Sequence, residues 1–118
     1  MKEVRVALNE YSIVQPQADS PFLVLKVGQP YKLNISNVGR KVHVFSASSF
    51  FRKIALLKIG FGKNTEIESS RVNNIMIGAG KTVSLYFVPL EKGTYKVVCA
   101  LPLHLNAGMQ SQIVVQGG

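Results

Sequence analysis

The residues in this sequence that are best suited to chemistry are its cysteine, its histidines and one methionine. Cys99 is the only cysteine, and His104 and Met109 follow it in one short segment. Cysteine and methionine are soft metal ligands and imidazole is a borderline one, so the combination suits copper better than magnesium or calcium. Zinc normally takes four strong ligands, several of them Cys or His. The segment therefore indicates a copper site that needs one further ligand.

His43, the other of the two histidines, is the candidate for that ligand. It lies in a strand-like run after the turn signal Asn37-Val-Gly39, far from Cys99 in the sequence, as a ligand from a neighbouring strand would. A Cys and two His with a weakly bound Met form the arrangement of electron-transfer copper sites. Each residue alone is more often structural than ligating. Together they favour a mononuclear copper site, whereas Met76, in an apolar run, is expected in the core.

Alternating apolar and polar residues predict the strands that would position these side chains. Tyr95, Val97 and Cys99 alternate with other residues, so a strand here would point the thiol toward a core. We expect further strands at residues 4–14 (one strand or a pair), 22–27, 31–36, around His43, 72–77, 82–87 and 111–115. Seven or eight short strands with few helices predict an all-β fold, a Greek-key β-sandwich.

Residues 46–64 break this alternation. A serine cap signal followed by helix formers predicts a short helical excursion near residues 49–57, with Phe50, Ile54 and Leu57 on one face. The segment would either cover the metal-binding end of the sandwich or pack ordinarily against it. Ordinary packing is the preferred interpretation.

Length and composition fit one folded domain. The chain has 118 residues, of which 17% are charged and 47% hydrophobic, so we expect a single domain over residues 1–118. We also expect a monomer. One cysteine excludes an internal disulfide. No apolar run approaches the length of a membrane helix, so we expect no membrane span in this chain.

Positive charge is concentrated in one half of the sequence. The formal net charge is +8, and no acidic residue occurs between Asp19 and Glu66. The basic residues in that interval are Lys26, Lys32, Arg40, Lys41, Arg52, Lys53, Lys58 and Lys63. This half would steer an acidic partner or bring the protein to an anionic surface, or it is simply a solvated basic face. Nucleic acid is not an expected partner, because no binding motif or stacking pattern of aromatic residues accompanies the charges.

Around its candidate ligands the sequence resembles the cupredoxins, the small blue-copper proteins. The similarity extends from about residue 23 to the end and consists of an early histidine, a Gly-x-Tyr-x-x-x-Cys segment and a Cys-x-x-Pro-x-His-x-x-Ala-Gly-Met loop. The matching positions are His43, Gly93, Tyr95, Cys99, Pro102, His104, Ala107, Gly108 and Met109. The resemblance implies one copper ion per chain, with the equatorial ligands His43, Cys99 and His104 and the axial ligand Met109. Val44 departs from the pattern, which often has a polar residue after the first histidine.

The resemblance also implies a function, electron transfer by a type 1 copper site that cycles between Cu(II) and Cu(I). The partner would be a redox protein such as a c-type cytochrome or a terminal oxidase, acidic at its docking face and bound transiently. An apolar skin around His104 would form the docking patch. Its residues are Ala100, Leu101, Pro102, Leu103, Leu105 and Ala107.

The sequence is also compatible with other functions. The alternative is a copper-binding module for storage, delivery or sensing, although such modules tend to have open sites rich in Met or His. A copper enzyme is not expected, because the sequence has no further His and no second Cys for another metal centre. The family's usual residence implies a periplasmic or other extracytoplasmic location, and we expect that a signal or anchor has been removed from this chain.

Overall fold

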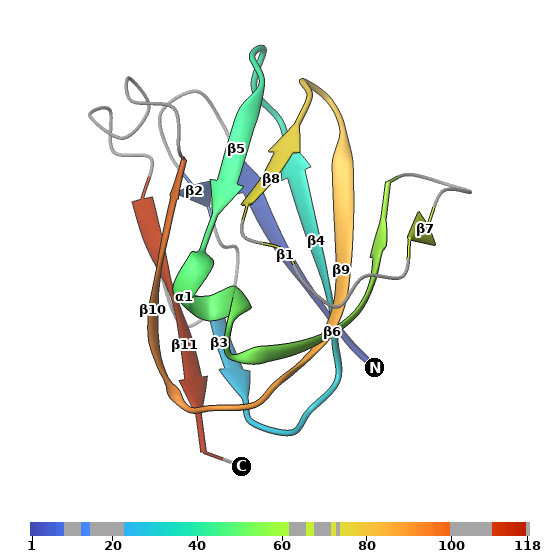
Figure 1. The fold of residues 1–118 in the computed structure, drawn as a ribbon. Helices are drawn as coiled ribbons and strands as arrows, with labels where there is room; N and C mark the ends of the chain where they lie inside the picture. Colours follow the sequence, from blue (N-terminus) through green and yellow to red (C-terminus); the bar gives the residue numbers. More distant parts are fainter. Residues whose placement is uncertain are drawn as a thin grey trace.

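Two β-sheets face each other across a hydrophobic core in the computed structural model of this protein (Figure 1). The structure describes residues 1–8, 13–14, 23–61, 66–67, 72, 74–99 and 110–117, with the backbone alone at 13–14, 66–67, 99 and 110. The first sheet has the order β2 (Ile13–Val14), β1 (Lys2–Leu8), β4 (Tyr31–Asn37), β9 (Thr82–Pro89), β6 (Ile54–Gly60) and β7 (Glu66–Ile67). The second sheet has the order β3 (Leu23–Lys26), β11 (Gln110–Gln116), β10 (Gly93–Cys99), β5 (His43–Ser46) and β8 (Asn74–Ile77). A short helix, α1 (Ser48–Phe51), lies between β5 and β6.

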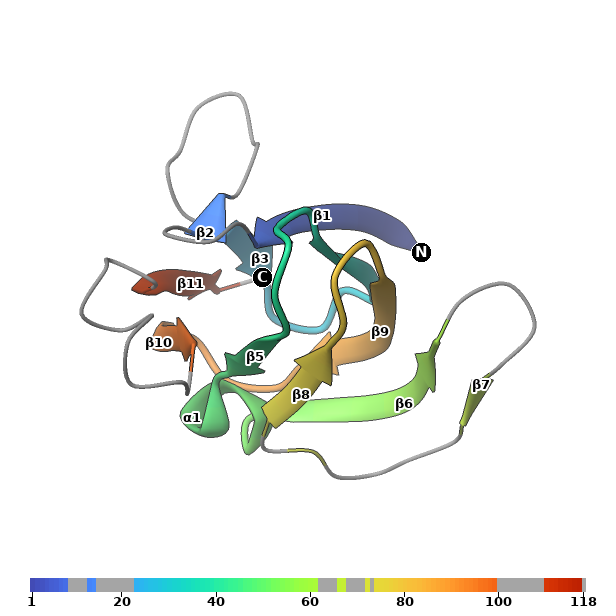
Figure 2. The same cartoon turned by 90° about the horizontal axis from the view of Figure 1, so that it is seen from above.

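Neighbouring strands are often distant in the sequence. β1 pairs in parallel with β4, and β3 pairs in parallel with β11. Within the described residues, the chain crosses between the sheets from β3 to β4, from β4 to β5, from β5 to β6, from β8 to β9 and from β9 to β10. As a result β5 lies between β8 and β10, as Figure 2 shows from above. Such crossings are typical of Greek-key sandwiches, and the predicted all-β sandwich is confirmed.

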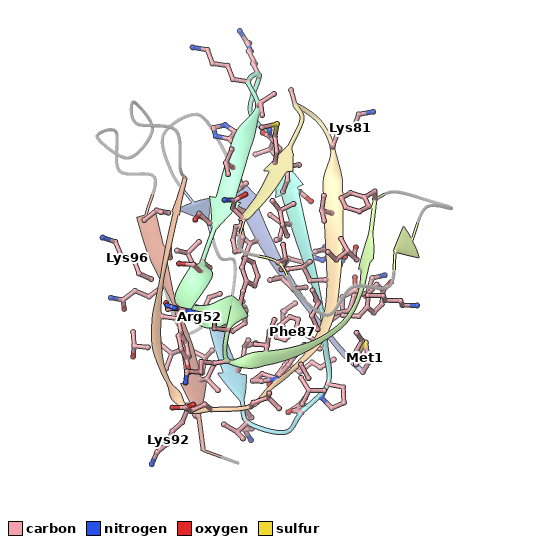
Figure 3. The ribbon with its side chains drawn as sticks, viewed as in Figure 1. Met1, Arg52, Lys81, Phe87, Lys92 and Lys96 are labelled. Carbon is pink, nitrogen blue, oxygen red and sulfur yellow. The ribbon has the colours of Figure 1, made fainter. Side chains whose placement is uncertain are left out.

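The alternation of apolar residues explains why these strands have one face in the core. In β4, Tyr31, Leu33 and Ile35 are buried, while the residues between them are half-buried. β9 has the same pattern, and its Phe87 points into the space between the sheets (Figure 3). A side-chain period of two places every second residue on the same face, so apolar and polar residues separate onto the two faces.

Phe50 of α1 joins the two sheets through a cluster of aromatic rings. Its ring centroid lies 5.5 Å from that of Phe87 on β9 and 5.7 Å from that of Tyr95 on β10. Phe51 contacts Phe45 of β5, with the centroids 6.1 Å apart. Pairs in such tilted geometries stabilise the fold by about 0.5–1.5 kcal/mol each beyond the burial of their area. The helix therefore packs into the core, as the preferred interpretation of this segment predicted.

The helix predicted near residues 49–57 is wrong in its second half. α1 ends at Phe51, and its N-cap residue is Ala47, which makes no side-chain capping hydrogen bond. The chain then turns and enters β6, which pairs with β9. Strand pairing and the burial of Phe50 and Phe51 therefore determine this segment, rather than a serine cap.

A β-bulge explains why β6 did not look like a strand in the sequence. The register with β9 shifts between Leu56 and Lys58, so Leu57 is an extra residue and is exposed. An extra residue interrupts the alternation of period two. β6 and the two-residue strand β7 were both missed, so the expected seven or eight strands were too few. The described residues contain eleven strands, of which β2 and β7 have two residues each.

The prediction that Met76 lies in the core is also wrong. Met76 is 71% exposed, because its neighbours Ile75 and Ile77 take the inward positions of β8. In the pairing with β5, Met76 lies opposite Val44.

The described helix is far too short to cross a membrane, and no other helix occurs in the described residues.

A hydrogen bond from Tyr95 stabilises the turn that leads into β10. Its hydroxyl donates a hydrogen bond of 2.7 Å to the main-chain oxygen of Glu91. Burial raises the pKa of Tyr95 above its ordinary value of 10.0, Glu91 raises the pKa further, and Lys53 partly offsets the increase. The folded protein thus holds this proton more tightly than the unfolded chain does. The associated stability is complete below pH 10 and is lost as the pH rises through the folded pKa.

We therefore expect Tyr95→Phe to change stability in a pH-dependent way. The variant should lose about 1 kcal/mol of unfolding free energy near neutral pH, because the hydrogen bond to Glu91 is missing. It should also show a smaller further loss above pH 10, because it has no hydroxyl to titrate. Urea denaturation at neutral and alkaline pH measures both effects. The same alkaline loss in both proteins would contradict the assignment to Tyr95.

Candidate metal centre

His43 is the predicted ligand whose side chain the structure describes. It is the first residue of β5, its side chain is 0% exposed, and both ring nitrogens are buried. Ile77 of β8 lies directly opposite it in the register. His43 and Phe45 occupy the same face of the strand, and Phe45 belongs to the core. The imidazole therefore takes an inward position at one end of the sandwich.

Cys99 is the last residue of β10, and its backbone lies opposite Phe45. His43 comes two positions before Phe45, so it is the diagonal neighbour of Cys99 on the adjacent strand. Diagonal positions of paired strands are roughly 7–8 Å apart, which is within the reach of longer side chains. Strand pairing thus brings two of the predicted ligand positions to the same end of the same sheet.

The rest of the predicted ligand set lies outside the described residues. This applies to the side chain of Cys99, to His104 and Met109, and to the apolar patch expected around His104. The assignment of the four ligands therefore stays a prediction. Among the side chains that are described, no three of His, Cys, Asp and Glu gather at one point.

The described part of the site fits a copper ion. A buried imidazole is costly unless its nitrogens have partners, and metal coordination is one such interaction. The borderline nitrogen of His43 lies beside a strand that ends in a cysteine, and this donor chemistry is that of electron-transfer copper sites. Copper would be held by His43 together with the predicted ligands Cys99, His104 and Met109.

The role of Asn37 was missed at the level of sequence. It is the last residue of β4 and is 1% exposed. Its side-chain amide donates hydrogen bonds of 2.8 Å to the main-chain oxygens of Lys41 and Ile77. The Asn-x-Gly pattern signalled a turn, and the bond to Gly39 belongs to that turn. No local signal could have indicated Ile77, because it comes from a different part of the chain.

The end of the sandwich that carries His43 is positively charged. Arg40 and Lys41 are exposed in the connection between β4 and β5, and Lys81 is exposed in the connection between β8 and β9. Backbone hydrogen bonds join Asn37, at the end of β4, to Gly80 and Lys81 of the β8–β9 connection, and the two connections lie side by side in both views (Figures 1 and 2). Lys81 extends outward from this end, whereas Lys92 extends from the opposite one (Figure 3).

Apolar side chains are exposed among these charges. Val38 and Val42 are exposed in the β4–β5 connection, and Met76 is exposed on β8. Met76 also lines a groove of about 430 Å³, together with Lys81 and Phe61. Surfaces that bind other proteins commonly combine an exposed apolar area with a charged rim.

Comparison with known proteins identifies the family to which this chain belongs. The sequence pattern of the copper-binding proteins of the plastocyanin/azurin family matches residues 26–116. The chain therefore belongs to this family, a family of cupredoxins. Copper is therefore its cofactor. A search of the curated proteins finds no match.

Solved structures of larger copper proteins share the fold. The copper nitrite reductase from Nitrosomonas europaea matches with a TM-score of 0.72 and 14% identity, over 98% of this chain and 49% of that one. A multicopper oxidase from Campylobacter jejuni matches with a TM-score of 0.71 and 14% identity, over 100% and 30%. A copper-containing nitrite reductase from Thermus scotoductus matches with a TM-score of 0.72 and 11% identity, over 98% and 31%. This chain thus spans about half or less of the length of these proteins, and the likeness concerns the fold.

Proposed function

We propose that this protein is a one-electron carrier whose type 1 copper site cycles between Cu(II) and Cu(I). The observation that carries the proposal is the complete burial of His43 at the end of β5, diagonal to Cys99. Membership of the plastocyanin/azurin family identifies the metal as copper. The proposed ligands are His43, Cys99, His104 and Met109, with one copper ion per chain.

The contribution of the chain to electron transfer is to hold its ligands in place. Copper, when bound, supplies the one-electron redox chemistry. His43 is fixed by the pairing of β5 with β8 on one side, and the pairing of β5 with β10 fixes the following residues on the other. Groups that are already in position need little rearrangement when the charge of a site changes. A buried His43 on a paired strand therefore supports rapid cycling between the two oxidation states.

The burial of His43 also favours the carrier over a copper storage, delivery or sensing module. Such modules release metal, which requires ligands that incoming groups can reach, whereas both ring nitrogens of His43 are buried. We do not propose catalysis, because both histidines and the only cysteine of the sequence belong to one proposed site. The reductases and oxidases that share the fold are much longer chains.

The proposed partner is a redox protein that is acidic at its docking face, such as a c-type cytochrome or a terminal oxidase. Arg40, Lys41 and Lys81 place positive charge at the end that carries His43, and Val42 and Met76 add exposed apolar area. Electrostatic steering combined with a small contact suits a transient redox encounter. The usual residence of the family supports a periplasmic or other extracytoplasmic location.

Titration of the apo-protein with Cu(II) tests the proposed function. We expect an intense visible band from thiolate-to-copper charge transfer that saturates at one copper ion per chain. The paramagnetic resonance spectrum should have a small parallel hyperfine splitting, and reduction should bleach the band. A weak, broad spectrum typical of tetragonal copper, or rapid loss of the metal to a mild chelator, would refute the carrier and favour copper delivery.

A further inference from the structure

Asn37 lies beneath the metal-binding end of the sandwich, where the two sheets meet. It ends β4 in the first sheet and is 1% exposed. Its side chain uses both kinds of hydrogen-bonding group. The amide nitrogen Nδ2 donates to the main-chain oxygens of Lys41 and Ile77, each at 2.8 Å, and the oxygen Oδ1 accepts a bond of 2.9 Å from the main-chain nitrogen of Gly39. One buried side chain thus holds three backbone groups.

The two carbonyl groups that Asn37 holds lie on either side of His43. Lys41 comes two positions before His43 in the chain. Ile77 is the residue directly opposite His43 in the pairing of β5 with β8. Asn37 therefore fixes both the approach to β5 and the neighbouring strand at the level of His43.

Backbone hydrogen bonds strengthen the same junction. The main-chain nitrogen of Asn37 donates to the oxygen of Lys81 at 2.9 Å, and the nitrogen of Gly80 donates to the oxygen of Asn37 at 2.9 Å. Gly80 has a φ of 74°, a conformation that favours glycine and closes the β8–β9 connection tightly. Figures 1 and 2 show the β4–β5 and β8–β9 connections side by side at this end. The first sheet is thereby tied to β5 and β8 of the second.

We propose that Asn37 is the positioning residue for His43, which rests on the proposed role of His43 as a copper ligand. Asn37 holds the backbone around His43 in its final place before metal arrives, so copper meets a preformed ligand. It also resists movement of β5 when the charge of the site changes. Only asparagine has two N–H donors and an acceptor at this length. Aspartate offers no donor when ionised, and serine offers a single hydroxyl.

Asn37→Ala tests the proposal against a matched control, Asn34→Ala. Asn34 lies on the same strand, and its side chain also makes two hydrogen bonds, donating to Glu3 Oε1 and accepting from Ser84 Oγ, each at 2.6 Å. It faces outward from the sheet, away from His43. Both variants lose side-chain hydrogen bonds, but only Asn37→Ala releases the backbone around His43.

The first measurement is amide hydrogen exchange in the apo-protein, which requires no copper. We expect Asn37→Ala to accelerate exchange in residues 38–46 and 74–81 relative to both the wild type and Asn34→Ala. Equal exchange of these segments in the two variants would overturn the proposal. Because this comparison uses apo-protein, it remains decisive even if the wild type fails to form a type 1 copper site, which would refute the proposed function alone.

The second measurement is the affinity and the visible spectrum of bound Cu(II). Loss of groups that orient metal ligands typically weakens metal binding about 10–100-fold, and we expect a loss of this size with a shifted band for Asn37→Ala. Asn34→Ala should keep the wild-type affinity and spectrum. If both variants lose stability but keep the wild-type copper site, Asn37 is structural only and the proposal fails.

A milder substitution covers the case in which Asn37→Ala does not fold. Asn37→Ser keeps one short hydroxyl, which has a single donor and therefore cannot bind the carbonyl oxygens of both Lys41 and Ile77. We expect intermediate copper affinity and intermediate exchange in residues 38–46. Wild-type values of both quantities in Asn37→Ser would overturn the proposal.

Discussion

Cys99→Ser is expected to abolish the intense visible band that the proposed type 1 copper site predicts. The band requires charge transfer from a thiolate, and a serine hydroxyl is a hard oxygen donor that stays protonated near neutral pH. Any copper that remains bound should give the weak, broad spectrum of tetragonal copper. His43→Ala should have a comparably large effect, because it removes the fully buried imidazole from the end of β5. Titration with Cu(II), followed by visible and paramagnetic resonance spectra, measures both results.

The methionines provide a matched control for this ligand assignment. Met109→Leu should shift the band and the reduction potential, because it removes the proposed weak axial ligand. Met76→Leu should leave both unchanged, because Met76 is 71% exposed on the outer face of β8. An unchanged spectrum in Cys99→Ser, or equal shifts in the two methionine variants, would contradict the proposed ligand set.

Local patterns in the sequence predict most of the fold. Strand β4, and β9 as far as Phe87, alternate between inward apolar residues and more polar ones, and each was placed correctly. The pattern fails at β6, where Leu57 is inserted as a bulge and shifts the inward positions. It also fails at β8, which is too short and too apolar for alternation to show that Met76 points outward. Tertiary pairing decides both cases.

The candidate site, like the fold, could be predicted from the sequence only in part. Residue chemistry identifies His43 and Cys99 as possible ligands, because soft and borderline donors are rare in this sequence. Their diagonal relation depends on which strands become neighbours, and β5 and β10 are far apart in the chain. Asn37 is harder still to find. Its chemical type suits a turn, and its partner Ile77 is revealed only when β8 is placed beside β5.

Reversing two charges at the end that carries His43 should slow electron exchange with an acidic redox protein, if the proposed copper site and partner are correct. Arg40, Lys41 and Lys81 are exposed at this end, and Lys41 and Lys81 can be replaced without removing the main-chain oxygens that bind Asn37. For Lys41→Glu combined with Lys81→Glu, we expect the bimolecular rate with an acidic c-type cytochrome to fall about tenfold or more at low ionic strength. Stopped-flow mixing with the copper-loaded protein measures this rate.

The control places the same charge change elsewhere. Lys92 and Lys96 are exposed, and Figure 3 shows Lys92 at the opposite end of the molecule and Lys96 along β10. Lys92→Glu combined with Lys96→Glu alters the net charge equally, so it reproduces any effect of total charge. Salt should reduce the difference between the two double variants, because screening shortens the reach of the charges to about 8 Å at physiological ionic strength. Equal rates at every salt concentration would show that the partner does not dock at the end that carries His43.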